Sequence, residues 1–270
     1  MADTPVLSAH GVKKVFNVKD GELVALEGLD LGISEGEFVC LVGASGCGKS
    51  TLLNLFAGFT QPTEGEVRLR GEAITGVEPR CGMVFQSYAL FPWKTVRRNV
   101  QFGLKMQGVS KNEQEAIADQ YIKMVNLDGF EDHYPPELSG GMQQRVTFAR
   151  ILAANPEVFL MDEPFAALDA MTRQVMQQEL LNIHEKSRKT TVFVTHNIDE
   201  ALLLADTIVV MSARPGRIKA VIKNHLPRPR RIEVQLSPDY LEIKKEIWDY
   251  VEEEVRSHME ATGVQLGEDG

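Results

Sequence analysis

Hydrophobic and polar positions form short runs over the first forty residues of the chain. The β-forming stretches 6–8, 11–16 and 24–33 are separated by turn residues, a pattern that predicts strands. The apolar run Phe38–Val42 comes next and ends at a glycine-rich loop, which is typical of a buried parallel strand. Residues 50–58 then have a helical pattern that ends at glycine.

Charged, helix-favouring residues dominate from residue 94 to about 155. Ser110 precedes such a run, as an N-cap serine does, and the segment predicts a helical lobe inserted between strands. Further on, strand and helix patterns alternate at 158–161, 172–186, 190–195, 198–205 and 207–211, before a last helix at 241–258. This alternation predicts an α/β fold with a mostly parallel sheet and helices around it.

The charge and the apolar content narrow the class of protein. A formal net charge of −9 disfavours a broad nucleic-acid surface, although residues 227–231 are locally basic and are interpreted as a solvated linker. There is no run of about 18 apolar residues, as a membrane-spanning helix needs. The opening Met1–Pro5 does not resemble a secretory signal, so we expect a reducing, cytosolic compartment with three reduced cysteines.

The most specific motif follows the strand at 38–42 and has the spacing Gly-x-x-x-x-Gly-Lys-Ser. Glycines let backbone N–H groups curl around phosphate oxygens, and the next helix points its positive end at the same oxygens. Lys49 is expected to reach the terminal phosphates, and the Ser50 hydroxyl to ligate Mg²⁺. The predicted ATP-binding loop is Gly43, Ala44, Ser45, Gly46, Cys47, Gly48, Lys49, Ser50 and Thr51. Cys47 is either an oxidation-sensitive switch or a small residue that fits the loop.

Two acidic residues end the apolar strand that begins at Val158. Asp162 is placed to orient the shell of Mg²⁺, and Glu163 to polarise an attacking water as general base. An apolar run that ends in Asp-Glu is a weak signal alone. Together with the phosphate loop it predicts hydrolysis of ATP.

A second phosphate-seeking element begins at Ser139, Gly140 and Gly141, which open the helix predicted over 142–154. It is either an ordinary capped helix or a helix start whose bare N–H groups bind phosphate. One phosphate loop is enough to hold ATP. A second helix N-terminus that attracts phosphate is explained if it binds the nucleotide held by a second copy of this chain.

These motifs, in this order, resemble the ATP-binding subunits of ABC transporters over residues 5–220. The resemblance implies a P-loop NTPase core, an N-terminal antiparallel β-subdomain and an inserted helical subdomain. It places the ATPase domain at 1–225, the helical subdomain at about 88–155, and a charged helical extension at 226–270.

The resemblance also implies roles for single residues. Ser139–Gly141 resemble the ABC signature, which acts in trans across a head-to-tail dimer. Gln86 resembles the Q-loop glutamine, which contacts Mg²⁺, and His196 the switch histidine, which contacts the γ-phosphate; with Glu163 these form the expected catalytic set. Asp169 resembles the D-loop aspartate.

Adenine is expected to stack on an aromatic side chain near the N-terminus. Phe16 is the best match to the family's aromatic position, where tyrosine is common, and Val18 and Val24 are alternatives.

The segments 83–93 and 211–217 resemble those of nitrate, sulfonate and taurine importers. The resemblance implies a small oxyanion as solute, transmembrane permease subunits, a periplasmic binding protein and a peripheral place on the cytoplasmic face of the inner membrane. Within the first segment, Phe91-Pro-Trp93 is either a docking knob for a partner or a buried anchor.

Two rival functions are weighed against transport. One is a non-transport ABC ATPase in DNA repair or translation, which the acidic charge and the lack of long heptads or a second cassette disfavour. The other is a phosphate-loop kinase or GTPase, which the signature disfavours. Solute and dimer composition stay open.

Overall fold

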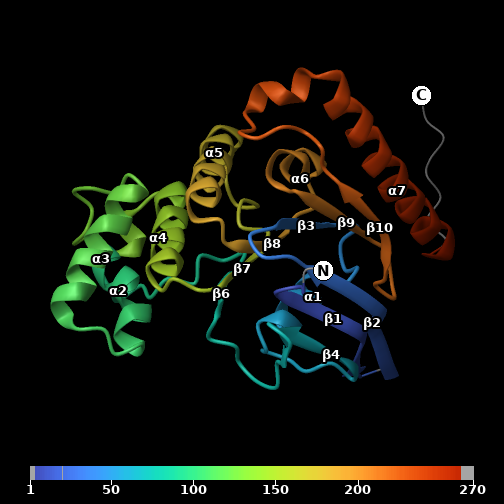
Figure 1. Ribbon diagram of the computed structural model, residues 1–270, viewed down its shortest axis with the longest axis horizontal. Coiled ribbons are helices and arrows are strands. Elements are labelled where there is room, and N and C mark those ends of the chain that lie inside the picture. The colour runs from blue at the N-terminus through green and yellow to red at the C-terminus, as the bar shows by residue number, and fades with distance from the viewer. Residues whose placement is uncertain (1–3, 20, 263–270) are drawn as a thin grey trace. The chain divides into compact units, whose positions relative to one another are not determined.

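The computed structural model describes residues 4–19 and 21–262, which form two compact units (Figure 1). The core unit consists of the chain up to Glu78 and from Arg188 onward, and the inserted unit is Pro79–Ser187. Residues 1–3 and 263–270, the outer ends of the predicted domains, lie outside the described residues.

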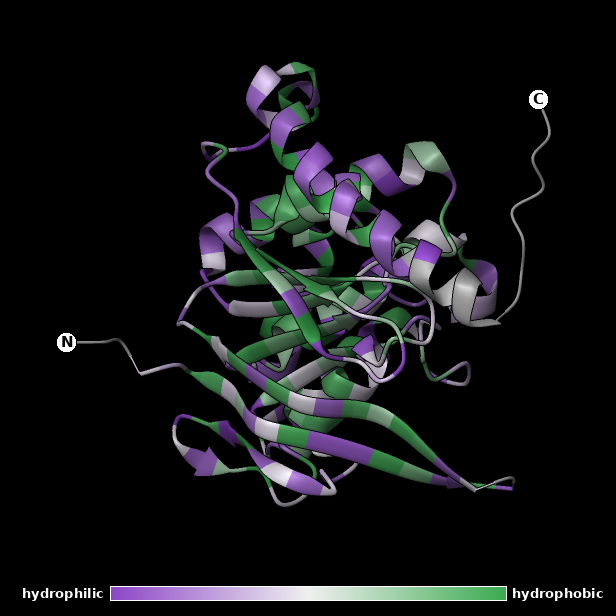
Figure 2. Ribbon diagram, turned by 90° about the vertical axis from the view of Figure 1, so that its right-hand side faces the viewer, coloured by the Kyte–Doolittle hydropathy of each residue, from purple (hydrophilic) through white to green (hydrophobic). Residues whose placement is uncertain are grey.

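The N-terminal part of the core unit is an antiparallel sheet with the strand order β2-β1-β4-β5, as the fold prediction expected. Its strands are β1 (Leu7–Val18), β2 (Gly21–Ile33), β4 (Glu64–Leu69) and β5 (Glu72–Ala73). The predicted break between strands 6–8 and 11–16 is wrong, because β1 runs through it as a bulge at Gly11, whose φ is 54°. In Figure 2 the long antiparallel strands alternate between hydrophobic and hydrophilic residues, as expected for a sheet with one solvated face.

A second sheet forms the interior of the core unit. Within this unit its strands have the order β10-β9-β3-β8, and they are β3 (Phe38–Val42), β8 (Thr190–Val194), β9 (Thr207–Met211) and β10 (Ile218–Lys223). β3 is parallel to β8 and β9, and all residues of these three strands are buried, which explains their continuous apolar runs. Helices α1 (Lys49–Phe56) and α6 (Ile198–Leu204) belong to the same unit.

The strand register brings three loops to one edge of this sheet. Leu41 of β3 lies opposite Val194 of β8, and Val42 lies opposite Val210 of β9. The loops that follow these parallel strands therefore leave from the same carboxyl edge, which is where ligands bind in open α/β sheets.

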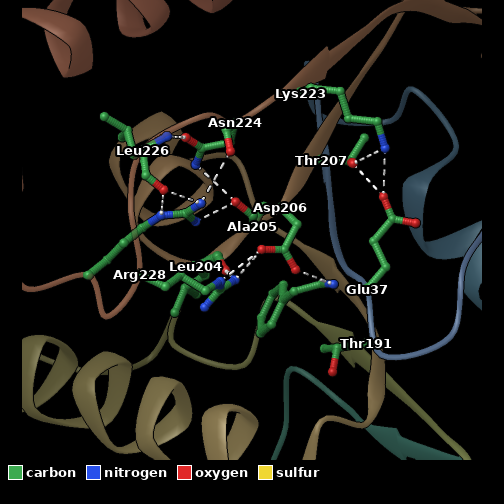
Figure 3. Close-up of polar contacts among 12 residues, drawn as sticks. Glu37, Thr191, Leu204, Ala205, Asp206, Thr207, Lys223, Asn224, Leu226 and Arg228 are labelled. Carbon is green, nitrogen blue, oxygen red and sulfur yellow. Dashed lines mark hydrogen bonds and ion pairs between the residues drawn. The ribbon is translucent and has the colours of Figure 1, made fainter.

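Charged side chains tie the ends of the core strands together (Figure 3). Glu37 accepts a hydrogen bond from Thr207 Oγ1 (2.5 Å) and one from Lys223 Nζ (2.9 Å). Its other carboxylate oxygen accepts from the Ser34 N–H at 2.9 Å. The carboxylate thus joins the start of β3 to β9 and β10.

The basic segment 227–231 is not the solvated linker that its sequence predicts. Arg230 is 2% exposed and donates to Ala205 O, and Arg228 pairs with Asp206 and donates to Leu204 O (Figure 3 shows Arg228). Both guanidinium groups donate to carbonyls at the C-terminal end of α6. The last carbonyls of a helix have no N–H partner within the helix, so they need donors of this kind.

The chain of the core unit ends in η2 (Ile232–Leu236) and the long helix α7 (Pro238–Thr262). α7 packs on α6, β9 and β10 of the same unit (Figure 1). None of the helices in the described part of the chain has the length and apolar character needed to cross a membrane.

The inserted unit combines a parallel strand pair with helices. The strands are β6 (Cys81–Val84) and β7 (Val158–Asp162), and the helices are α2 (Val96–Met106), α3 (Lys111–Met124), η1 (Pro135–Glu137), α4 (Gly140–Ala153) and α5 (Ala170–Ser187). Ser110 caps α3 as predicted, with Glu113 completing a capping box.

Candidate functional site

The phosphate loop follows β3 in the core unit, and its conformation requires glycine. Gly43, Gly46 and Gly48 have φ values of 154°, 76° and 95°. A Cβ on Gly48 would lie 2.5 Å from Leu26 Cδ2, so a side chain there would collide with β2 as well as strain the backbone. Cys47 is buried against this loop, which favours its interpretation as a small residue that fits.

The helix that follows the loop presents an open N-terminus. Gly48 is the N-cap of α1, and among the described residues no side chain caps the helix and no acidic residue occupies its first turn. The side chain of Lys49 is folded into the loop, where Nζ donates to Gly43 O (2.8 Å) and Ala44 O (2.9 Å). Ser50 is exposed beside it. Uncapped N–H groups with a lysine form a site for the phosphates of a nucleotide.

His196 leaves the same edge of the core sheet, two residues after Val194. It is exposed, and its neighbours hold the backbone firmly. Thr195 Oγ1 donates to Glu200 Oε2 at 2.6 Å, and the Asn197 side chain caps α6 by accepting from the N–H groups of Asp199 and Glu200. The loop thus presents the imidazole from a fixed turn beside the phosphate loop's strand.

Phe16 lies on the β1–β2 hairpin, opposite Leu23. Its ring is 38% exposed, and Lys14 Nζ lies 5.0 Å from the ring centroid. Leu23 and Val18 are exposed too, so the hairpin carries an apolar surface for the flat face of a base, with Leu23 as a member that the sequence interpretation missed.

The carboxyl ends of β6 and β7 place three predicted residues together in the inserted unit. Val84 lies opposite Met161, so Gln86 and Glu163 each follow two residues later from adjacent parallel strands, and Asp162 ends β7. Glu163 has a φ of 43°, in the left-handed region that side chains rarely adopt. Strain of this kind is common at functional sites, where the surrounding structure holds it in place.

The signature glycines are required by close packing. Ser139 is the N-cap of α4 and accepts from the Met142 N–H at 3.3 Å. A Cβ on Gly140 would lie 2.8 Å from the Tyr88 hydroxyl oxygen, and one on Gly141 would lie 2.6 Å from Thr172 Cγ2. The helix start therefore sits against the segments that carry Gln86 and Asp169, and these functional loops gather within the inserted unit.

Comparison with known proteins agrees with this geometry. Residues 26–166 match the family described as ABC transporter. The nitrate import ATP-binding protein NrtD of Synechocystis is 45% identical over 247 residues, which cover 89% of this chain and 93% of that protein. The chain belongs to the ABC transporter family.

Two further relatives extend the comparison of this ABC protein. The bicarbonate transport ATP-binding protein CmpC of Synechococcus elongatus is 44% identical over 93% of the chain, which spans 38% of that longer protein. A dimeric ATP-binding cassette, solved in a post-hydrolysis state with ADP and Pi, is 35% identical with a TM-score of 0.73; the match covers 82% of this chain and 100% of that cassette. The chain is an ATP-binding subunit of an ABC transporter and an ATPase.

Asp169 is positioned at the start of α5 in the inserted unit. Its Oδ1 accepts from the Thr172 N–H at 3.0 Å. The hydrogen bonds of the Thr172 side chain and backbone hold the pKa of the Asp169 carboxyl below its ordinary value, so it is charged at neutral pH. Thr172 is also the residue against which Gly141 packs, so the D-loop and the signature share one neighbour.

Phe91 and Trp93 have separate surroundings in the same unit. The Phe91 ring lies 4.5 Å from that of Phe102 and 5.9 Å from the Arg150 guanidinium, so it anchors the helices. Trp93 is 70% exposed. The packing of Phe91 agrees with the interpretation as an anchor, and docking of a partner on the exposed Trp93 stays a prediction.

The donors predicted for Mg²⁺ fit that ion by their chemistry. No group of three or more His, Cys, Asp or Glu side chains among the described residues could hold a metal alone. Ser50, Gln86 and Asp162 supply a hydroxyl, an amide oxygen and a carboxylate, which are hard oxygen donors. Mg²⁺ is typically held by one or two carboxylates together with waters and phosphate oxygens, and such a set needs no all-protein cage.

Sequence reasoning connected the turn 212–217 with the importer subfamily but not with the phosphate loop. It leaves the carboxyl end of β9 and packs on the phosphate loop: a Cβ on Gly43 would lie 2.7 Å from Met211 O, and one on Gly216 would lie 2.1 Å from Cys47 O. The Pro215-Gly216 pair predicts a turn, but the sequence does not show that this turn packs on the phosphate loop.

Proposed function

We propose that this ABC ATPase energises the import of a small oxyanion, and that it works as a peripheral subunit at the cytoplasmic face of the cell inner membrane. The open phosphate site formed by Gly43–Thr51 and the uncapped α1 carries the nucleotide part of this proposal. The solute class rests on the relatives that are named for nitrate import and bicarbonate transport. Their names support transport over the alternative in DNA repair or translation.

The proposed working form is a dimer of two such subunits on transmembrane permease subunits, fed by a periplasmic binding protein. Each ATP lies between residues 43–51 of one subunit and Ser139–Gly141 of the other. Two observations support it: the N-terminus of α4 at Ser139 has the positive end of a helix dipole, which suits a phosphate, and a related cassette is dimeric with ADP and Pi.

In the proposed reaction, Lys49 and the N–H groups of α1 hold the β- and γ-phosphates, and the Phe16 ring stacks on adenine. Glu163 accepts the proton of the attacking water, while His196 and Gln86 orient the γ-phosphate and the water. Mg²⁺, held by Ser50, Gln86 and Asp162, would neutralise charge on the leaving phosphate oxygens. Because ATP and ADP bind the closed dimer with different affinity, hydrolysis reopens it and moves the permease.

Reconstitution tests this function. The subunit is purified in complex with its transmembrane permease subunits, placed in liposomes with the binding protein, and assayed for ATP hydrolysis with nitrate, bicarbonate or taurine. We expect at least one of these anions to stimulate hydrolysis severalfold over the same vesicles without it. Equal rates with all anions and without them would contradict the oxyanion importer, and stimulation by taurine alone would assign the solute to sulfonates.

A further inference from the structure

Helix α7 contacts the core unit at two points that flank functional loops. Near its start, the Tyr240 hydroxyl donates to Asp199 Oδ1 at 2.6 Å, and Lys244 Nζ lies 2.6 Å from the same oxygen. Asp199 belongs to the first turn of α6, three residues after His196. Fourteen residues after Tyr240, Glu254 reaches the turn 212–217. The helix therefore spans about 21 Å between the two points.

Glu254 holds both arms of the β9–β10 hairpin. Its Oε2 accepts from the Ala213 N–H at 2.7 Å, and its Oε1 accepts from Lys219 Nζ at 2.6 Å. The Glu254 side chain is only 13% exposed. Burial alone would lower the pKa of Lys219, but the hydrogen bonds and charges of Glu254 and Glu253 raise it, so Lys219 is charged at neutral pH.

The turn that Glu254 holds is tied together by hydrogen bonds of its own. The Ser212 N–H donates to Arg217 O at 2.9 Å, and the Arg217 N–H donates to Ser212 Oγ at 3.0 Å. Ser212 Oγ in turn donates to Pro215 O at 3.1 Å. Because these bonds connect the two ends of the turn, the position of Ala213 is coupled to that of Gly216.

The same turn is packed on the phosphate loop with no free space. Gly216 lies so close to Cys47 O that a Cβ would be 2.1 Å from it, and the Arg214 guanidinium is 3.1 Å from the position of a Cβ on Gly46. Gly216 also bonds to β2 through its N–H and the Ala25 carbonyl at 3.0 Å. Close-packed atoms transmit a displacement, so the position of this turn sets that of the loop.

We propose that Glu254 is a positioning residue of the nucleotide site: from α7 it fixes the turn 212–217, and the turn fixes the phosphate loop in its ATP-binding conformation. The inference rests on the proposed ATP site at residues 43–51. A loop that is held in its bound conformation binds tightly because little ordering remains to be done on binding. The C-terminal extension is thereby part of the ATPase, although it contributes no group to the nucleotide.

The test is the affinity of the full-length protein for Mg·ATP, measured by calorimetry. Glu254→Ala removes the contacts with the Ala213 N–H and Lys219, and alanine is favourable in a helix. Glu253→Ala is the matched control, because Glu253 is the neighbouring residue and also pairs with Lys219, at 2.9 Å. We expect Glu254→Ala to raise the Kd and the KM for ATP about three- to tenfold, with kcat nearly unchanged. This is the size of effect expected from the loss of a hydrogen bond to a charged group. Glu253→Ala should stay within about twofold of the wild type.

Conservative variants separate positioning from general stability. Glu254→Gln keeps an acceptor for the Ala213 N–H and should recover most of the affinity. If Glu254→Ala does not fold, Glu254→Asp, which is one methylene too short, should show the same rise in Kd. Wild-type affinity in Glu254→Ala or Glu254→Asp, or equal losses in the Glu253 and Glu254 variants, would overturn the inference. Lys49→Ala reports on the site itself: if it retained full affinity, the proposed nucleotide site would fail instead.

Discussion

Glu163 is held in a left-handed conformation directly after a buried strand, with a φ of 43°. Such a residue costs about 1–3 kcal/mol of strain, which the surrounding structure must offset. The conformation turns the residue out of the strand direction that Asp162 follows, so two adjacent carboxylates can serve different roles. The sequence Asp-Glu gives the chemistry, but only the backbone explains how the two are separated.

Replacing Glu163 by glutamine tests its role as general base. Glutamine cannot accept the proton of water, so we expect kcat for ATP hydrolysis to fall about 100-fold or more. The Kd for ATP, measured with a fluorescent nucleotide, should change little, since Lys49 and α1 hold the phosphates. Glu115→Gln, an exposed carboxylate of α3, is the control. A Glu163→Gln protein that hydrolyses ATP at the wild-type rate would refute the assignment.

Several features at the residue scale were out of reach of the sequence. The motif spacing placed Lys49 in the phosphate loop, and the structure shows its ammonium group bonded to loop carbonyls. The sequence could not show that Gly141 faces Thr172, because the two residues are brought together by the packing of α4 and α5. Arg230 appeared to be a solvated charge, since its partner is a backbone carbonyl that no sequence pattern records.

At the scale of elements, Glu37, directly before β3, links the start of β9 to the end of β10. Burial alone would raise the pKa of its carboxyl, but the hydrogen bonds from Thr207, the Ser34 N–H and Lys223 hold it below the ordinary value. A depressed folded-state pKa stabilises the fold above the unfolded pKa of about 4.3, and this stability is lost as pH falls through the folded value.

We therefore predict that Glu37→Gln lowers the free energy of unfolding by about 1–2 kcal/mol at pH 7. The difference from the wild type should shrink as pH falls from about 4.3 through the lower folded-state pKa, below which the folded wild-type carboxyl is protonated too. Urea unfolding at a series of pH values measures this. Glu22→Gln, an exposed carboxylate of β2, is the control. A difference that does not vary with pH would show that the carboxylate charge contributes nothing.

Elements with continuous apolar runs were predictable, and short or glycine-containing ones were not. β3, β8 and β9 are buried throughout, so their runs stand out in the sequence. β6 contains Gly82, which lowers strand propensity but is needed because a Cβ there would lie 2.8 Å from Ile151 and Pro156. The sequence also gave no sign that α7 is attached to the turn 212–217, since that contact depends on tertiary packing.

At the scale of the whole molecule, the α/β class followed from the strand–helix alternation, and the antiparallel N-terminal sheet was implied by the resemblance to ABC ATP-binding subunits. Each unit carries part of the proposed machinery: the phosphate loop, Phe16 and His196 belong to the core unit, while Gln86 and Glu163 belong to the inserted unit. Sequence alone could not decide whether Ser139–Gly141 serve the same subunit or another, because this depends on assembly rather than on the fold.

The central claim is that each ATP site is shared between two subunits, and mixing two inactive variants tests it most directly. Lys49→Ala disables the phosphate loop. Ser139→Asp keeps a favoured N-cap residue for α4, but its negative charge would repel the phosphates of ATP.

The measurement is the ATPase rate of a 1:1 mixture of these two proteins, beside each protein alone. If the sites are shared, half of the randomly paired dimers contain one intact site of two, so the mixture should reach about a quarter of the wild-type rate while each variant alone stays near zero. A mixture that is as inactive as its components, although sequential purification through a different affinity tag on each variant shows mixed dimers with ATP, would contradict the account.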